Sequence, residues 1–165
     1  MLSISMNKLV PLIVTALALS ALNVQAGSPH FIGTPKLALT DDGDLCVSFK
    51  EAGLGNTLIT YRLTVGLAEF TFQCFTKSGN TPQGDPNGQS FSNETATTSI
   101  QPRNGRIIGT LCLSPEQGDA DCQGGGLVLK LVAVAYSAGT FCDITNNVCV
   151  NTAAKSEEID PPIEF

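Results

Sequence analysis

Six cysteines are the residues of this 165-residue sequence with the clearest chemistry, because thiols either bind metal ions or oxidise to disulfides. A structural zinc site needs closely spaced cysteine or histidine pairs, whereas these spacings are wide and the only histidine, His30, stands far from every cysteine. An even number of cysteines in an exported chain is typical of a disulfide framework. We therefore expect three disulfides. The cysteines are Cys46, Cys74, Cys112, Cys122, Cys142 and Cys149.

Carboxylates gather in two polar stretches of the sequence. Asp41, Asp42 and Asp44 form the first group, and Asp119 and Asp121 form the second. Calcium prefers carboxylate and carbonyl oxygens, and paired carboxylates also serve glycosidases, but neither stretch contains a complete calcium-loop motif. Aspartate is common in turns for conformational reasons, so turn formation is the simpler interpretation of both groups. Asp41, Asp42 and Asp44 stay candidate calcium ligands.

The side chains of common catalytic sites are not assembled in this sequence. Ser-His-Asp and Cys-His sites need a histidine held against a nucleophile, and His30 near the mature terminus is the only one. No G-x-S-x-G motif occurs. Sugar-binding sandwiches usually present aromatic platforms, but the chain has no tryptophan and its two tyrosines, Tyr61 and Tyr136, stand in apolar runs. We expect a non-enzymatic protein without catalytic residues or cofactors.

The segments that carry these groups predict an all-β fold. Short runs rich in Val, Ile, Leu, Thr and Phe alternate with polar residues and end at Gly, Pro, Asn or Asp. This alternation places Cys46 and Cys112 on strand faces that point away from the apolar core. The strands are predicted at 36–40, 45–50, 57–65, 68–76, 95–101, 106–113 and 127–136, with a hairpin at 140–150.

About eight short strands without helices favour an immunoglobulin-like two-sheet β-sandwich stabilised by disulfides. A closed β-barrel is the alternative fold. The polar stretch 77–93 is too long for an ordinary hairpin turn and is predicted to be a surface loop. Because loops on rigid frameworks often carry binding function, we expect this loop to contact a protein or surface-glycan partner.

The N-terminus predicts export. Lys8 precedes an apolar run from Leu9 to Leu22 and small residues ending at Ala26, which together are typical of a signal peptide spanning 1–26. A membrane span needs about 20 apolar residues, more than this run or the run 127–136 provides. We expect a secreted or periplasmic domain at 27–151 and an acidic, loosely ordered tail at 152–165.

The charge of the mature chain narrows the range of partners. Lys8 is the only charged side chain before Gly27, so the mature chain has eight basic and fifteen acidic side chains, a formal charge of −7. Binding to nucleic acid or to an anionic membrane needs a basic surface that neutralises phosphates. The charge therefore disfavours both partners.

Three phrases of the mature chain resemble a known family. These are SPHFIGTP at 28–35, AGLGN at 52–56 and PRNG at 102–105. In this order they are similar to phrases of a family of small secreted bacterial β-rich proteins of uncharacterised function. The resemblance extends to about residue 136, implies export and a β-rich fold, and implies no activity.

The resemblance also bears on disulfide pairing. Cysteines recur in that family in phrases matching Cys74 and Cys122, which implies that these two residues form a pair. Family members often have a further cysteine just after the first phrase, where this chain has Lys36 and Leu37. That departure leaves Cys46 without its family partner, and Cys112 is the candidate replacement. Proximity along the chain pairs Cys142 with Cys149.

The sequence leaves three functions open. The leading hypothesis is a non-enzymatic interaction or structural protein that acts through its loops. The first alternative is a hydrolase or a carbohydrate-associated accessory module that uses the turn carboxylates. The second is a pilin-like assembly subunit, since such sandwiches assemble by strand donation.

Overall fold

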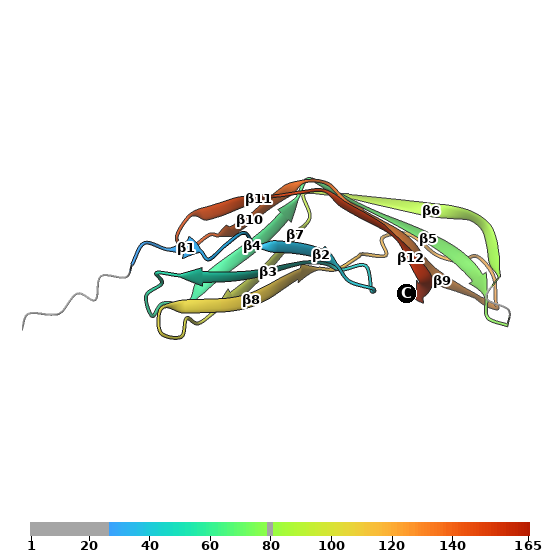
Figure 1. Ribbon diagram of the computed structural model, residues 1–165. Coiled ribbons are helices and arrows are strands. Elements are labelled where there is room, and N and C mark those ends of the chain that lie inside the picture. The colour runs from blue at the N-terminus through green and yellow to red at the C-terminus, as the bar shows by residue number, and fades with distance from the viewer. Residues whose placement is uncertain (1–26, 79–80) are drawn as a thin grey trace, which may run out of the picture.

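The computed structural model describes residues 27–78 and 81–165, and the expected signal peptide at 1–26 lies outside the described residues. The regular secondary structure within these residues consists of strands alone, and the paired strands are antiparallel (Figure 1). The strands are β1 (His30–Phe31), β2 (Lys36–Leu39), β3 (Leu45–Ala52), β4 (Ile59–Val65), β5 (Leu67–Thr76), β6 (Pro82–Ser92), β7 (Thr95–Ile100), β8 (Arg106–Leu113), β9 (Leu127–Tyr136), β10 (Gly139–Asp143), β11 (Val148–Thr152) and β12 (Lys155–Glu164).

Two of the three sheets form one long bent layer. Sheet B has the strand order β11-β10-β4-β7, and sheet C has the order β12-β9-β5-β6. Each strand of sheet B is joined across one or two residues to the strand at the same position of sheet C, so the four connections lie together at the bend (Figure 1). Gly139 stands at this bend because a Cβ there would collide with the backbone carbonyl of Thr64.

Sheet A forms the second layer, against sheet B. Its central strand β3 pairs with β8 on one edge and with both β1 and β2 on the other. The ring of Phe49 on β3 lies 4.4 Å from that of Tyr61 on β4 and 4.7 Å from that of Phe141 on β10. Aromatic side chains from both sheets therefore fill the space between the layers.

This architecture is a β-sandwich whose sheets do not close into a barrel. The all-β sandwich predicted from the sequence is confirmed, and the barrel alternative is wrong because β7 and β11 are the edges of sheet B and β6 and β12 those of sheet C. The immunoglobulin-like character of the sandwich stays a prediction. Among the described residues, no helix is long and apolar enough to cross a membrane.

The core face of sheet C is covered by a turn and a segment without regular structure. A Cβ at Gly43, in the β2–β3 turn, would lie 3.0 Å from the side chains of Leu131 and Val134 on β9, so the turn lies directly over that strand. The segment 114–126 extends this cover, and its Ala120 is buried in the same core cluster. Sheet C is thus covered mainly by a turn and a loop.

The predicted surface loop at 77–93 is wrong for most of its length. Pro82–Ser92 form strand β6, which pairs antiparallel with β5. The polar composition wrongly indicated a loop, because strand pairing uses backbone groups and a solvent-exposed edge strand needs few apolar side chains. Pro82 and Pro86 fit there because one edge of β6 has no partner strand, so a missing backbone N–H on that side is tolerated.

The predicted loosely ordered tail at 152–165 is also wrong. Lys155–Glu164 form strand β12, which pairs with β9 in two stretches separated by a register shift between Glu158 and Ile163. Ile159 lies within this irregular stretch, is only 6% exposed and belongs to the core cluster. The acidic composition concealed an edge strand that inserts one isoleucine into the core while its carboxylates face water.

Candidate functional site

The six cysteines form the three disulfides Cys46–Cys112, Cys74–Cys122 and Cys142–Cys149, and none of the six is free. Cys46 and Cys112 stand directly opposite each other on β3 and β8, and Cys142 and Cys149 do the same on β10 and β11. Cys74 on β5 is instead joined to the segment 114–126. Three disulfides indicate folding in an oxidising extracellular or periplasmic environment.

The outer face of sheet A is cationic, and we call it the cationic face. Alternation along β2, β3 and β8 turns Lys36, Lys50 and Arg106 outward, away from the core. No aspartate or glutamate stands at an outward position of these three strands. A chain with fifteen acidic side chains thus concentrates positive charge on one sheet face.

Two exposed isoleucines add apolar surface to the same face. Ile108 is 76% exposed and stands opposite Lys50, and Ile32 is 47% exposed. Both line a groove of about 680 Å³, together with Gly33, Thr34, Lys36, Ser48, Phe49, Lys50, Gly109 and Thr110.

The groove exists because the edge of sheet A is interrupted. β1 and β2 pair with the same edge of β3, and the four residues 32–35 between them leave the strand path. Gly33 has a φ of 73°, a backbone conformation that favours glycine. Pro35 has no backbone N–H, so it cannot donate a hydrogen bond to a neighbouring strand. Ile32 still donates its backbone N–H to the carbonyl of Lys50 (2.8 Å). The interruption therefore forms one wall of the groove.

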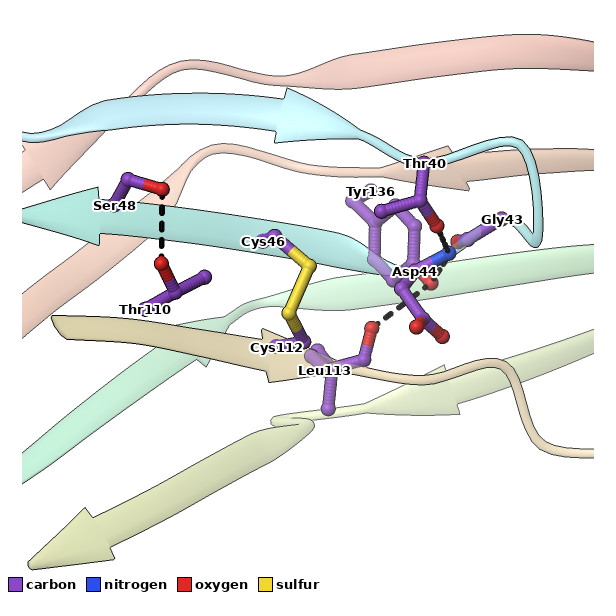
Figure 2. Close-up of a disulfide and its surroundings, with 9 residues drawn as sticks. All are labelled: Thr40, Gly43, Asp44, Cys46, Ser48, Thr110, Cys112, Leu113 and Tyr136. Carbon is purple, nitrogen blue, oxygen red and sulfur yellow. Dashed lines mark hydrogen bonds between the residues drawn. A yellow bond between two sulfur atoms is a disulfide. The ribbon is translucent and has the colours of Figure 1, made fainter.

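The floor of the groove is held by side-chain links across β3 and β8. The hydroxyls of Ser48 and Thr110 are hydrogen bonded at 3.1 Å (Figure 2). The Cys46–Cys112 disulfide links the same two strands two residues away, before Ser48 on β3 and after Thr110 on β8. Lys36, Lys50 and Ile108 thus stand on a braced sheet surface.

A second group of polar side chains is buried between sheets A and B. Glu51 on β3 is completely buried, and its Oε2 accepts a hydrogen bond from the hydroxyl of Tyr61 at 2.6 Å. The other oxygen, Oε1, has no hydrogen-bond partner. The pKa of Glu51 is raised to about 7, mainly because burial disfavours the charged form; the Tyr61 hydrogen bond opposes this rise, and the negative charge of Asp143 adds to it.

Asp143 is equally buried but fully hydrogen bonded. Its Oδ1 accepts backbone hydrogen bonds from Thr145 (2.8 Å) and Asn146 (2.9 Å), and its Oδ2 accepts one from the Asn146 side chain at 2.6 Å. These bonds close the β10–β11 hairpin turn, where aspartate caps the backbone. The phenol of Tyr61 has its pKa raised by burial and by the nearby Glu51, so it stays protonated as a donor.

The candidate calcium ligands lie beside strand β12. Asp41 and Asp42 line a hollow of about 410 Å³ together with residues of β12, which include Glu157, Glu158 and Asp160. Asp44 is held in the turn, where its backbone N–H donates to the Thr40 hydroxyl (Figure 2). Within residues 27–78 and 81–165, no three His, Cys, Asp or Glu side chains converge to hold a metal ion. The geometry adds no support for the calcium hypothesis.

The remaining sequence candidates have local roles. Asp121 accepts a hydrogen bond from the backbone of Cys122, and the backbone of Asp119 donates to Gln89 on β6. His30 lies exposed on β1, with its Nδ1 donating to the carbonyl of Ser28 at 2.8 Å. Neither aspartate lines the hollow that Asp41 and Asp42 share with β12.

Sequence reasoning missed both the buried carboxyl pair and the cationic face. Leu45, Val47 and Phe49 are the inward residues of β3, and continuing the same alternation by one step places Glu51 inside. The sequence carried this signal, but the predicted strand ended at Lys50, two residues before the end of β3 and one before Glu51. The cationic face needed the pairing of β2, β3 and β8, which the sequence pattern does not contain.

No protein-family model matches the chain, and a search of curated proteins found no relative. The fold and its covalent links define the class of protein: a disulfide-bonded, all-β sandwich built for an oxidising environment. The three family-like phrases meet at one end of it, where Leu54 donates its backbone N–H to the carbonyl of Gly105 and Ser28 lies against Gly53.

Proposed function

We propose that the protein is an exported, non-enzymatic interaction protein that binds an acidic, partly apolar segment of a partner protein. The observation that carries the proposal is the cationic face, where Lys36, Lys50 and Arg106 share one side of sheet A with two exposed isoleucines, although the chain as a whole is acidic. Ammonium and guanidinium groups attract carboxylates, while isoleucine side chains gain free energy when another apolar group covers them. An acidic segment with apolar side chains satisfies both requirements.

Two features support export. The first 26 residues have the composition of a signal peptide, and the mature domain carries three disulfides. The expected contact surface moves from the stretch 77–93 to the cationic face, because most of that stretch is paired with β5. A groove of about 680 Å³ on a braced sheet is a more rigid receptor than a polar strand at a sheet edge.

Charge reversal tests this function. The mature protein is titrated into labelled peptides of alternating Glu and Val, of Glu alone, and of alternating Lys and Val, with anisotropy as the readout. We expect the Glu-Val peptide to bind most tightly, because it alone offers both charge and apolar contact, and its affinity should fall as salt screens the lysines. Lys36→Glu/Lys50→Glu should weaken this binding at least tenfold.

Lys77→Glu/Lys155→Glu is the matched control, since it changes the net charge equally at positions away from the groove. Equal weakening by both double variants would show that only net charge matters and would overturn the proposal. Failure of the Glu-Val peptide to bind the wild type more tightly than the Lys-Val peptide would also overturn it.

A hydrolase or carbohydrate-associated module is the second candidate, and the hollow beside β12 favours it. Asp41 and Asp42 share this hollow with Glu157, Glu158 and Asp160, so several carboxylates border open space. Incubating the mature protein with a panel of glycans tests this candidate by product release. A product made by the wild type and lost in Asp41→Asn/Asp42→Asn would support it, and no product from the wild type would contradict it.

A pilin-like subunit is the third candidate. Sheet C has two edge strands, β6 and β12, that could accept a strand of another molecule. Both edges carry prolines and charged side chains, which oppose edge-to-edge pairing, so this candidate has the weakest support.

A further inference from the structure

Within residues 27–78 and 81–165, Glu51 has the one buried side-chain oxygen or nitrogen without a hydrogen-bond partner. Its side chain is fully buried, one oxygen accepts a hydrogen bond from Tyr61, and Oε1 has no partner. A buried oxygen without a partner costs free energy even when the carboxyl group is neutral. The cost is much greater once the group ionises, because the charge then loses its hydration.

The charged groups around Glu51 do not offset an ionised carboxylate. On β10, Asp143 is held by three hydrogen bonds to its carboxylate oxygens, and its charge repels a second negative charge. On β4, Tyr61 contributes only its hydroxyl. On β8, the residue opposite Glu51 is Ile107, which is apolar and buried. The one basic side chain that acts on Glu51 is His30, which lies exposed on β1.

The weakest cover over Glu51 is β1. Phe31 stands directly opposite Glu51 in the register of β1 and β3, and its ring packs 5.4 Å from Phe141 and 6.2 Å from Phe49. β1 has two residues, pairs only with β3 and holds no cysteine. β4 and β10, by contrast, each have a hydrogen-bonded neighbour on both sides. Short terminal strands of this kind open at much lower free energy than central strands.

We propose that β1 and the residues beside it, 27–32, form a pH-dependent latch. When Glu51 is protonated, the segment lies closed over it and Phe31 fills its place among the aromatic rings. When Glu51 loses its proton, two adjacent carboxylates are buried together, and release of the segment admits water to the new charge. The latch is closed in acidic solution and opens as the pH rises.

The latch also regulates the cationic face, and this part alone rests on the proposed function. Ile32 and Gly33 follow β1 directly and form part of the groove wall. Ile32 is attached to the sheet by the hydrogen bond from its N–H to the carbonyl of Lys50, at the position next to Glu51. Release of 27–32 therefore removes this wall, and partner binding weakens at alkaline pH.

Amide hydrogen exchange of the mature protein tests the latch. Protection factors, corrected for the pH dependence of intrinsic exchange, are measured from pH 5 to pH 9. The amide of Ile32 reports on the latch, and the amide of Val65, which donates to Glu94 at the bend, reports on the rest of the fold. Because burial raises the pKa of Glu51 to about 7, protection of Ile32 should fall by up to about tenfold per pH unit above neutrality, and protection of Val65 should not follow it.

Two substitutions sharpen the measurement. Glu51→Gln keeps the shape of the side chain, and its carbonyl oxygen can still accept the hydrogen bond from Tyr61 while its amide nitrogen can donate one toward Asp143. Because glutamine does not ionise, the amide of Ile32 should stay protected at every pH. Glu69→Gln is the matched control on sheet C and should behave as the wild type. Phe31→Ala removes the packing of the latch and should leave Ile32 poorly protected at both ends of the pH range.

The outcomes separate the two proposals. A wild-type protection factor for Ile32 that does not change with pH, or an equal loss in Glu51→Gln, overturns the latch. If Ile32 loses protection as expected while binding of the Glu-Val peptide stays constant with pH, the latch stands and its control of the cationic face is wrong. If that peptide does not bind at any pH, the proposed function fails and the exchange result is unaffected.

Discussion

The two halves of the molecule obtain their cores in different ways. Where sheets A and B face each other, aromatic rings from β1, β3, β4 and β10 pack between two layers of paired strands. Sheet C has no complete second sheet, and a turn with the segment 114–126 covers its core face. The comparison teaches that a loop can replace a sheet layer when it is fixed to the strands beneath it.

The three disulfides also differ in what they link in the two halves. Cys46–Cys112 and Cys142–Cys149 each link residues that strand pairing already holds opposite each other. Cys74–Cys122 alone ties the covering segment to sheet C, and both of its cysteines pack against the core cluster. The half with the weaker cover therefore depends most on its disulfide.

The largest expected effect is the loss of this link. By chain entropy, disulfides separated by 48 and 66 residues each stabilise by about 4 kcal/mol, and one separated by 7 residues by about 2.5 kcal/mol. Cys74→Ala/Cys122→Ala also loses core contacts worth about 1 kcal/mol, so it should destabilise more than Cys46→Ala/Cys112→Ala. Cys142→Ala/Cys149→Ala should have the smallest effect. Urea unfolding measures all three, and equal losses would remove the distinction between the halves.

Glu51→Gln should have the next largest effect, confined to the half formed by sheets A and B. Because the pKa of Glu51 is about 7 in the folded protein and 4.5 without burial, the folded state binds this proton more tightly. Stability therefore falls as the pH rises from about 4.5 to about 7, by up to about 3 kcal/mol. The variant should exceed the wild type by up to this amount at pH 8 and match it at pH 4. An equal difference at both values would assign the effect to packing.

Much of this fold could be predicted from the sequence. Alternation located the strands β2 to β5, β7 to β9 and the β10–β11 hairpin, and Gly43 and Asn104–Gly105 marked turns. The edge strands β6 and β12 were missed because a strand paired on one side keeps its backbone bonds with almost any side chains. The polar stretch 77–93 and the acidic tail therefore looked like loops.

The candidate sites were harder to predict than the strands. Glu51 and Asp143 are separated by most of the chain and meet only because β3 packs across β10. The cationic face likewise depends on the register that places Lys36 opposite Ser48 and Lys50 opposite Ile108. Local patterns report which face a residue occupies, whereas a site also depends on which strands are neighbours.

The smallest expected effect lies at the junction between the halves. Tyr136 on β9 is buried and donates its hydroxyl to the carbonyl of Gly43 at 2.9 Å, with the carbonyl of Leu113 at 3.5 Å (Figure 2). Tyr136→Phe keeps the ring but leaves the Gly43 carbonyl without this donor, which should cost about 1 kcal/mol. Because the turn of sheet A lies on β9 through this bond, hydrogen exchange should quicken at the amide of Gly43, which donates to the carbonyl of Thr40. An unchanged Gly43 amide would mean that apolar packing against Leu131 and Val134 holds the halves together without the hydroxyl.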